Sequence, residues 1–257
     1  MESVRIAELL EPYLGSASDQ RLTANDRIDI SIYIDILKRW NERTNLTAIR
    51  NEEEIVTRHF GESLFAARQL FPLCSPLFSV VKDVRVADVD SASAAERRQN
   101  AAHSVSRGFT SQEEEAAKQR KKITLADIGS GAGFPGIPIK LWAREISLTL
   151  IESNHRKATF LREIARALTL MDVNIMSARA ETVSQTFDVV TLRAVERFDS
   201  ILPVASGLVA PGGRLALLIG SAQLPSAQSA LPAFAWHPPT PIPSSQSRVI
   251  AIASNPE

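Results

Sequence analysis

The 257-residue sequence is poor in cysteine, in net charge and in long apolar runs. Its single cysteine, Cys74, excludes an internal disulfide and a multi-thiolate metal site, and it is typical of a reducing compartment. No stretch reaches the ~18 apolar residues that a membrane span needs, and no basic segment at the N-terminus leads into an apolar run. We therefore expect a cytoplasmic monomer without a membrane anchor or a bound metal.

The charges balance, because 29 lysines and arginines face 29 aspartates and glutamates. A nucleic-acid partner would therefore have to be held by a local basic patch and not by the field of the whole protein. The hydrophobic fraction of 44% and the charged fraction of 23% are those of an ordinary globular protein. The length allows one large domain, or one domain with an appendage.

Two helical patterns occupy the first 72 residues. Apolar residues recur at helical spacing between Leu22 and Leu46, and Thr23 with Asp26 three residues later predicts an N-terminal cap. The fragment ISIYIDI could also alternate as a strand, but length and capping favour the helix. A second pattern runs from Glu52 to Leu70, so residues 1–72 are predicted to form an N-terminal helical subdomain.

Residues 73–122 break these patterns. The segment is rich in Ser, Ala, Gln and charge and cannot bury enough apolar surface to order itself, which predicts a partly disordered insertion or linker. It ends in a basic cluster at 118–122 that is either solvated linker or a contact for RNA. We expect deletion of residues 90–117 to leave stability nearly unchanged.

From Ile123 onward, short β-rich runs alternate with helical ones. Strands are predicted at 123–128, 147–152, 173–176, 187–192 and 214–219, with helices near 136–144, 154–169 and 199–209. This alternation indicates an α/β domain over residues 123–257, with a mostly parallel, Rossmann-like sheet covered by helices on both faces. The late run SRVIAIA predicts an antiparallel edge.

The run ADIGSGAGFPGIP follows the first of these strands, where open α/β sheets bind ligands. Its glycines, at 129, 131 and 133, allow a sharp turn and the close approach of a ligand. Gly131, Gly133 and Gly136 also match the dinucleotide fingerprint G-x-G-x-x-G. A nicotinamide cofactor is therefore one possible ligand.

Two features of the turn favour a cationic ligand instead. Pro135 and Pro138 remove N–H donors that a pyrophosphate would use, and Asp127 adds a carboxylate. S-adenosylmethionine carries an ammonium and a sulfonium, which a carboxylate attracts. Glu152, which ends the second strand, could accept hydrogen bonds from the ribose hydroxyls of either ligand.

Two further segments follow later strands. In SARAE, Ala180 offers a backbone N–H and Glu181 a carboxylate at the height of an adenine ring, although Glu181 could equally be a helix-start acid. Arg193 ends the fourth strand, where it could contact the methionine part of the cofactor, anchor a substrate phosphate or form a surface salt bridge. We expect its removal to leave stability nearly unchanged.

The same strand end limits the chemistry. It reads TLRAVERF where methyltransferases of exocyclic base amines have an Asn/Asp-Pro-Pro-aromatic run, which disfavours amine methylation. Cys74 lies outside the predicted sheet, which disfavours a covalent route to C5 of a pyrimidine. A ring nitrogen without a proton, such as guanine N7, suits the site because its attack needs alignment and no obligatory base.

Taken together, WNERTNLTAIRNEEEIVTRHFGES, DIGSGAGFPGIP, RKATFLREI, ARAE and LRAVE resemble the RsmG (GidB) family of bacterial 16S rRNA guanine-N7 methyltransferases. The resemblance implies a class I methyltransferase with a seven-stranded sheet, the cofactor S-adenosyl-L-methionine, and 16S rRNA or the small ribosomal subunit as partner. It places Asn45, Arg58, His59 and Arg197 on the substrate side, although His59 could be a scaffold residue and Asn45 a helix C-cap. Together with the residue patterns it gives a predicted cofactor-binding set of Asp127, Gly129, Gly131, Gly133, Phe134, Glu152, Ser153, Asn154, Ala180, Glu181 and Arg193.

The sequence departs from this family at two places. The insertion at 73–122 replaces a short connection, and Ile219 stands where a lysine is common. A nicotinamide-dependent oxidoreductase and a non-catalytic ribosome-binding module remain the alternatives to the methyltransferase.

Overall fold

The computed structural model describes residues 1–15, 22–72, 122–194 and 198–257. Residues 1–72 and 123–257 form one compact unit. The predicted insertion at 73–122 lies outside the described residues except for its last residue, and so does Arg197. Within the described part, no helix has the length and apolar character to cross a bilayer.

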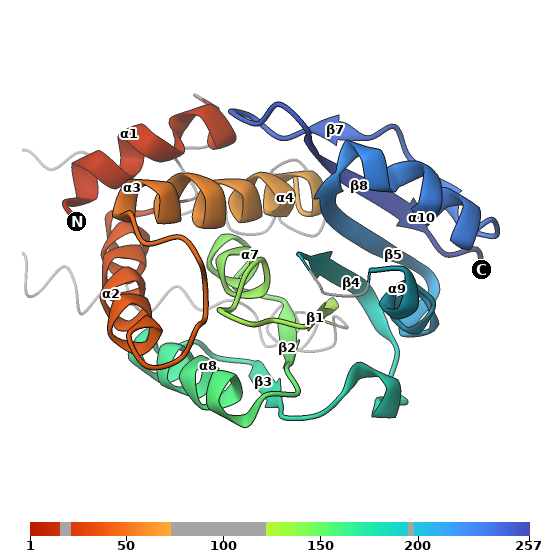
Figure 1. The fold of residues 1–257 in the computed structure, drawn as a ribbon, viewed down its shortest axis with the longest axis horizontal. Helices are drawn as coiled ribbons and strands as arrows, with labels where there is room; N and C mark the ends of the chain where they lie inside the picture. The colour runs from red at the N-terminus through yellow and green to blue at the C-terminus, as the bar shows by residue number, and fades with distance from the viewer. Residues whose placement is uncertain (16–21, 73–121, 195–197) are drawn as a thin grey trace, which may run out of the picture. The chain divides into compact units, whose positions relative to one another are not determined.

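The N-terminal segment is helical, as predicted (Figure 1). Helix α1 spans Ser3–Leu14 and α2 spans Ala24–Asn41, which is shorter than the pattern between residues 22 and 46. Thr23 caps α2: its hydroxyl accepts from the Asp26 N–H at 3.2 Å, while the Asp26 carboxylate accepts from the Thr23 N–H at 2.7 Å. This reciprocal capping starts the helix and decides against a strand.

The second predicted helix extends from residue 52 to residue 70, but it is not uniform. It begins as α3 (Glu52–Glu54), continues as the π-helical turn η1 (Ile55–Gly61) and ends as α4 (Glu62–Leu70). Gly61 lies against α1: a Cβ there would be 2.7 Å from the Tyr13 ring. The π-helical turn η1 therefore ends at Gly61, whose lack of a side chain allows this helix to approach α1 closely.

The sheet has its strands in the order β3-β2-β1-β4-β5-β8-β6, with β7 also paired to β8. Strands β1 (Thr124–Ile128), β2 (Ser147–Ile151), β3 (Val173–Met176), β4 (Phe187–Arg193) and β5 (Val209–Gly220) are parallel to their neighbours in this set. Strand β8 (Arg248–Ser254) is antiparallel to β5, which confirms the predicted antiparallel addition.

Within the described residues the sheet has eight strands and not seven. The difference comes from β6 (Ala235–Trp236) and β7 (Thr240–Pro241), which are two residues long and pair with different parts of β8. Proline lacks the N–H that a longer ladder would need, so the Pro-rich tail forms two short pairings and not one continuous strand.

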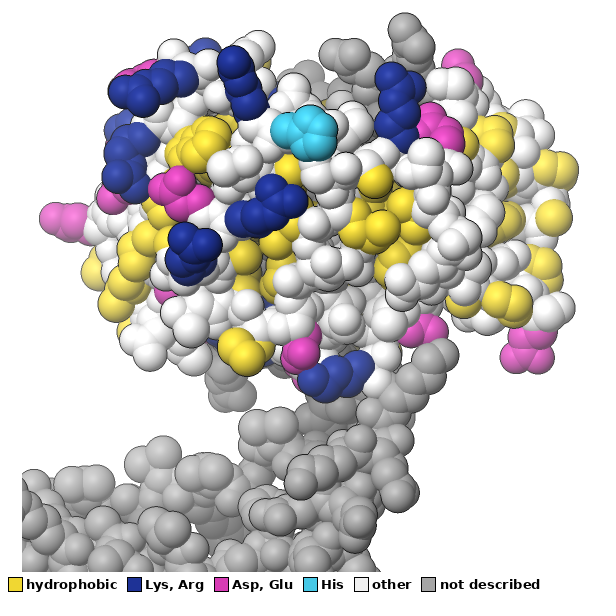
Figure 2. Space-filling model, turned by 90° about the horizontal axis from the view of Figure 1, so that it is seen from below, with side chains coloured by type: hydrophobic (Ala, Val, Ile, Leu, Met, Phe, Trp, Pro, Cys, Tyr) yellow, Lys and Arg dark blue, Asp and Glu magenta, His cyan; other side chains and the backbone are white. Residues whose placement is uncertain are grey.

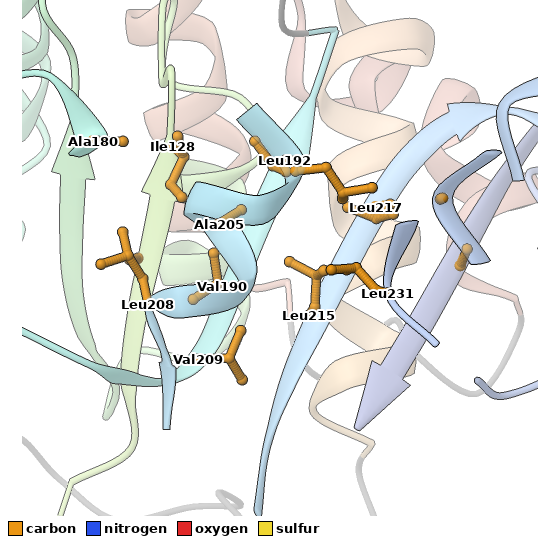
Figure 3. Packing of buried hydrophobic residues seen from close by; sticks show 14 of the residues in the cluster. Ile128, Ala180, Val190, Leu192, Ala205, Leu208, Val209, Leu215, Leu217 and Leu231 are labelled. Carbon is orange, nitrogen blue, oxygen red and sulfur yellow. The ribbon is translucent and has the colours of Figure 1, made fainter. Parts of the chain in front are cut away.

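Helices cover both faces of the sheet (Figure 1). On one face, α9 (Phe198–Gly207) and α10 (Leu224–Ala230) pack on the strands through a cluster that includes Val190, Ala205 and Leu217 (Figure 3). On the other, α4 contacts α7 (Gly136–Trp142), and its Phe65 packs in a cluster with Leu218 and Ile250. Helix α8 (His155–Ala167) contacts α2. The N-terminal helices are thus part of the layer that covers the sheet.

Candidate functional site

The glycine-rich turn follows β1 at the carboxyl end of the parallel strands, as predicted. Gly131 has a φ of +54°, and among the described residues a Cβ built on it would meet nothing nearer than the Gly129 carbonyl oxygen at 3.6 Å. Gly133 and Gly136 differ, because a Cβ on Gly133 would collide with the Tyr33 hydroxyl and one on Gly136 would lie 2.6 Å from Leu150. Gly131 therefore leaves open space that a ligand could fill, whereas the other two are required for packing.

Glu152 fixes this turn from the end of β2. One carboxylate oxygen accepts from the Gly131 N–H at 2.9 Å, and the other accepts from the Asn154 N–H at 2.8 Å. The Asn154 side chain caps α8 by accepting from the N–H groups of Arg156 and Lys157. A carboxylate offers about four acceptor positions, so Glu152 can still accept from the hydroxyls of a ribose.

Asp127 lies beneath the turn, not at its surface. The residue is 1% exposed, and its carboxylate accepts from the Thr191 hydroxyl at 2.8 Å and the Gly136 N–H at 3.2 Å. Burial is the main cause that raises the pKa of this carboxyl to about 7. Asp127 therefore holds strand β4 and the start of α7 together, and near neutral pH it does not supply the full negative charge that the sequence argument assumed.

Phe134 lies between two rings from the N-terminal helices. It stacks on Tyr33 with ring centres 5.3 Å apart and on His59 with centres 4.6 Å apart. The Tyr33 hydroxyl donates to the Ala132 carbonyl at 2.5 Å. The helical segment therefore directly fixes the conformation of the glycine-rich turn.

Arg193 ends β4 in a buried ion-pair network. Its guanidinium donates to the Glu62 carboxylate at 3.1 Å and to the Arg58 carbonyl at 2.5 Å, and the other Glu62 oxygen lies 2.7 Å from Arg248. The side chain of Arg193 is 11% exposed and that of Glu62 is 2% exposed. A surface salt bridge is thus excluded. Because Glu62 would lose a buried partner, we expect removal of Arg193 to destabilise the fold, in place of the small effect expected from the sequence.

His59 is held between Arg193 and Thr47. Its Nδ1 is 3.1 Å from the guanidinium of Arg193, and its Nε2 is 2.8 Å from the Thr47 hydroxyl. A guanidinium can only donate, so we assign the proton of the neutral ring to Nε2, which donates to Thr47. Burial, followed by the charge of Arg193, lowers the pKa of His59 to about 3. The ring is therefore neutral at physiological pH.

The remaining predicted residues occupy different surroundings. Asn45 is exposed in the loop after α2; the C-cap of α2 is Glu42, so Asn45 is not a helix cap. The exposed Arg58 side chain lines a separate hollow with Tyr13 and Arg248. Ser153 is exposed beside Glu152.

Ala180 and Glu181 belong to the short helix η3 (Ala180–Thr182), which follows β3. Ala180 is buried in the cluster of Figure 3, whereas Glu181 is exposed. Both therefore lie beyond the carboxyl end of the strand next to β2.

Three residues of this region escaped the sequence analysis. Glu62 links two arginines, Arg248 supplies the second of them, and Asn41 orders the loop before Thr47 through its side-chain amide. Asn41 could have been found, because an asparagine at a helix end commonly bonds nearby backbone groups. Glu62 lies inside a helical pattern, and no local feature of the sequence distinguishes it from a solvent-exposed acid.

This chain is similar to known proteins that share one family description. The profile of the family described as rRNA small subunit methyltransferase G matches residues 27–84 and 110–235. A relative named "Ribosomal RNA small subunit methyltransferase G" from Roseiflexus castenholzii is 35% identical over 72% of this chain and 62% of its own length. A relative of the same name from Desulfitobacterium hafniense is 33% identical over 81% of this chain and 70% of its own length.

Among solved structures, a ribosomal protein L11 methylase from Lactobacillus delbrueckii subsp. bulgaricus matches 56% of this chain and 76% of its own, with a TM-score of 0.45 and 21% identity. The strand order of this chain, together with its family match, identifies a Rossmann-like methyltransferase fold without use of the similarity to this methylase. The profile covers more than half of the chain, and the glycine-rich turn and Glu152 lie within the matched region. The chain belongs to the rRNA small subunit methyltransferase G family.

Proposed function

We propose that this protein transfers a methyl group from S-adenosyl-L-methionine to N7 of a guanine in 16S rRNA, as free RNA or within the small ribosomal subunit. Family membership and the name shared by the relatives support the reaction and the RNA class. The observation that carries the proposal is the open space at Gly131, next to the Glu152 carboxylate at the carboxyl edge of the sheet.

The residues around the turn fit this cofactor. Gly131 leaves room for it, and Glu152 can accept from its ribose hydroxyls. We assign the cofactor to the surface formed by Gly129, Gly131, Phe134, Glu152, Ser153, Asn154, Ala180, Glu181 and Arg193, with Asp127 and Gly133 as positioning residues beneath it. When bound, S-adenosylmethionine supplies a methyl group on a positively charged sulfur.

The protonation states fit a base without an acidic proton. Guanine N7 has a free lone pair, so its attack on a methyl group needs alignment and no general base. His59 is neutral and has both ring nitrogens engaged, so it positions Arg193 and Thr47 and does not accept a proton from the substrate. Amine methylation would release a proton that this histidine is not arranged to take.

Among the described residues, the network around Glu62 carries one excess positive charge, because two arginines face one carboxylate. An anion beside it would be stabilised. Arg193 could hold the carboxylate of the cofactor or a phosphate of the RNA. In the first case its removal raises the dissociation constant of the cofactor, and in the second the Michaelis constant for RNA.

We further propose that residues 1–72 contribute the substrate side of the site through Asn45, Arg58 and His59, and that Arg197 adds to it. The protein would act as a cytoplasmic monomer. A nicotinamide-dependent enzyme would need donors for a pyrophosphate at the turn. Gly136, which begins α7, instead gives its N–H to Asp127. The family match argues against this alternative as well.

The test is the transfer of a tritiated methyl group from labelled cofactor to small ribosomal subunits from a bacterial strain that lacks this activity. Nuclease digestion and mass spectrometry of the RNA should then identify 7-methylguanine. Gly131→Val is the matched inactive variant, because its branched side chain fills the open space. Label in another nucleoside would refute the N7 assignment, and no cofactor binding by the folded wild type would refute the methyltransferase.

A further inference from the structure

A surface hollow lies between the end of α2 and the start of α8. Its volume is about 690 Å³, which is within the range of pockets that hold small organic ligands. The residues that line it are Arg39, Trp40, Glu42, Arg43, Thr44, Arg156 and Glu163. None of them belongs to the cofactor-binding set proposed above.

The described residues that line the hollow give it an excess of positive charge, since three arginines face two glutamates. Arg39 lies 4.0 Å from Glu163, which is a long ion-pair distance. In the part of the chain that the structure describes, neither Arg43 nor Arg156 forms an ion pair, and both side chains are exposed. Figure 2, which views the molecule from the side of α8, shows Lys and Arg side chains gathered at one side of this face around hydrophobic ones. Two arginine side chains are thus available to an anion.

The first turn of α8 adds to this field. It contains Arg156 and Lys157 and no acidic residue. Cations at a helix N-terminus are unfavourable beside the positive end of the helix dipole, and most helices place acids there. The arrangement weakens the helix slightly but strengthens the attraction of the hollow for a phosphate.

Trp40 supplies a fixed aromatic surface in the hollow. Its indole N–H donates to Glu163 at 2.8 Å, and its ring meets the edge of Phe160 with ring centres 5.8 Å apart. These contacts hold the ring in place while part of it remains exposed. A pre-ordered aromatic ring beside cations is the arrangement on which single-stranded nucleic acids stack their bases.

The hollow is connected to the proposed active site at both of its walls. On one wall, the Arg156 N–H donates to the side chain of Asn154, and the Asn154 N–H donates to the carboxylate of Glu152. On the other, Thr44 is three residues before Thr47, the hydrogen-bond partner of His59. An RNA strand seated in the hollow would therefore have its neighbouring nucleotides at the edge where the cofactor is proposed to bind.

We propose that this hollow binds a single-stranded nucleotide that flanks the methylated guanine, with its base on Trp40 and its phosphate between Arg43 and Arg156. The inference rests on the proposed function, because it assigns part of the RNA substrate to a second position on the protein. A protein with no net charge must hold RNA through a local group of basic residues, and the three arginines that line this hollow form such a group.

The test compares the double variant Arg43→Glu/Arg156→Glu with wild type in methylation of small ribosomal subunits. Loss of charged hydrogen bonds to phosphate predicts a rise in the Michaelis constant for the subunit of at least about tenfold, with kcat and the affinity for S-adenosylhomocysteine unchanged. The slope of log affinity against log salt should fall by about one to two. Trp40→Leu should raise the same Michaelis constant about tenfold, and Trp40→Phe much less.

The matched control is Arg166→Glu, an exposed arginine on the same helix ten residues, or roughly 15 Å, beyond Arg156. Equal circular dichroism spectra establish that all variants fold. Ultraviolet crosslinking of the wild type to subunits should attach nucleotides to the peptide that contains Trp40 and Arg43. An unchanged Michaelis constant in the double variant, or crosslinks from this peptide to a ribosomal protein and not to RNA, would overturn the inference. If the wild type itself transfers no methyl group, the proposed function fails, which is a separate outcome.

Discussion

Replacing Arg193 with methionine should destabilise the fold, because the guanidinium is the centre of a buried network. The variant keeps much of the aliphatic volume but loses the donors to Glu62, the Arg58 carbonyl and His59. Breaking a buried ion pair costs about 3–5 kcal/mol. Glu62 retains Arg248 at 2.7 Å, so we expect the lower end of this range, about 3 kcal/mol of unfolding free energy.

A double-mutant cycle with Glu62→Gln separates the pair from the other effects of each change. Pairs within one network show coupling energies of about 0.5–3 kcal/mol, and we expect the upper half of that range here. The measurement is urea unfolding followed by circular dichroism at pH 7.5, with Arg166→Met as an exposed control. A loss below about 1 kcal/mol in Arg193→Met, with no coupling to Glu62, would refute the network as a stabilising feature.

The same variant gives an independent spectroscopic readout. Burial is the first cause that lowers the pKa of His59, and the charge of Arg193 is the second. Removing that charge should raise the pKa of His59, although burial still holds it below the ordinary value. The chain has four histidines, so NMR titration of the imidazole Cε1–H signals can follow this one ring. An unchanged titration of His59 in Arg193→Met would contradict the contact between the two side chains.

The remaining predictions concern the turn and its protonation. Gly131→Ala should cost about 1–2 kcal/mol for its left-handed φ and should abolish binding of S-adenosylhomocysteine in calorimetry, whereas Gly133→Ala should destabilise more, because its Cβ collides with the Tyr33 hydroxyl. In the wild type, the His59 signals should not titrate between pH 5 and 8; the stability that its lowered pKa provides is present above about pH 6.5 and is lost as the pH falls toward 3. Asp127 has the opposite sign: its pKa is raised to about 7, so the folded state binds the extra proton, and its contribution to stability should fall as the pH rises from about 4 to 7. Urea unfolding across this range, with Asp127→Asn as the reference, would contradict the buried carboxyl if the difference between the two proteins did not change with pH.

Sequence patterns predicted those helices and strands whose formation depends on residues close together in the sequence. The Thr23 cap could be read from the sequence because its partner is three residues away. The five parallel strands could be read because strands of such a sheet are short, mostly apolar runs bounded by turn residues. The glycine-rich turn was predicted at the correct edge of the sheet for the same reason. Which of its glycines faces open space could not be predicted, since that depends on Tyr33 and Leu150 from other elements.

The π-helical turn and the Glu62 network could not be predicted from such local patterns. Helical periodicity gives the extent of residues 52–70 but not a local widening that ends at Gly61, where the ring of Tyr13 approaches. Glu62 and Arg193 are 131 residues apart in sequence, and each occupies a position where an exposed charge would be ordinary. Their pairing is a consequence of tertiary packing, and only the packing explains why both are buried.

The helical subdomain and the sheet domain are separate segments of the sequence, but in the structure they pack together as one compact unit. Polar contacts join them at several places: Tyr33 to the Ala132 carbonyl, Trp40 to Glu163 and the Trp142 indole to the Phe71 carbonyl. The first of these bonds and the two rings stacked on Phe134 act on the glycine-rich turn itself. Because the turn that is proposed to hold the cofactor takes its shape from helices at the other end of the sequence, the residues proposed to face the RNA and those proposed to bind the cofactor are parts of one packed structure. A substrate that shifts α2 or η1 would therefore change the turn without contacting it.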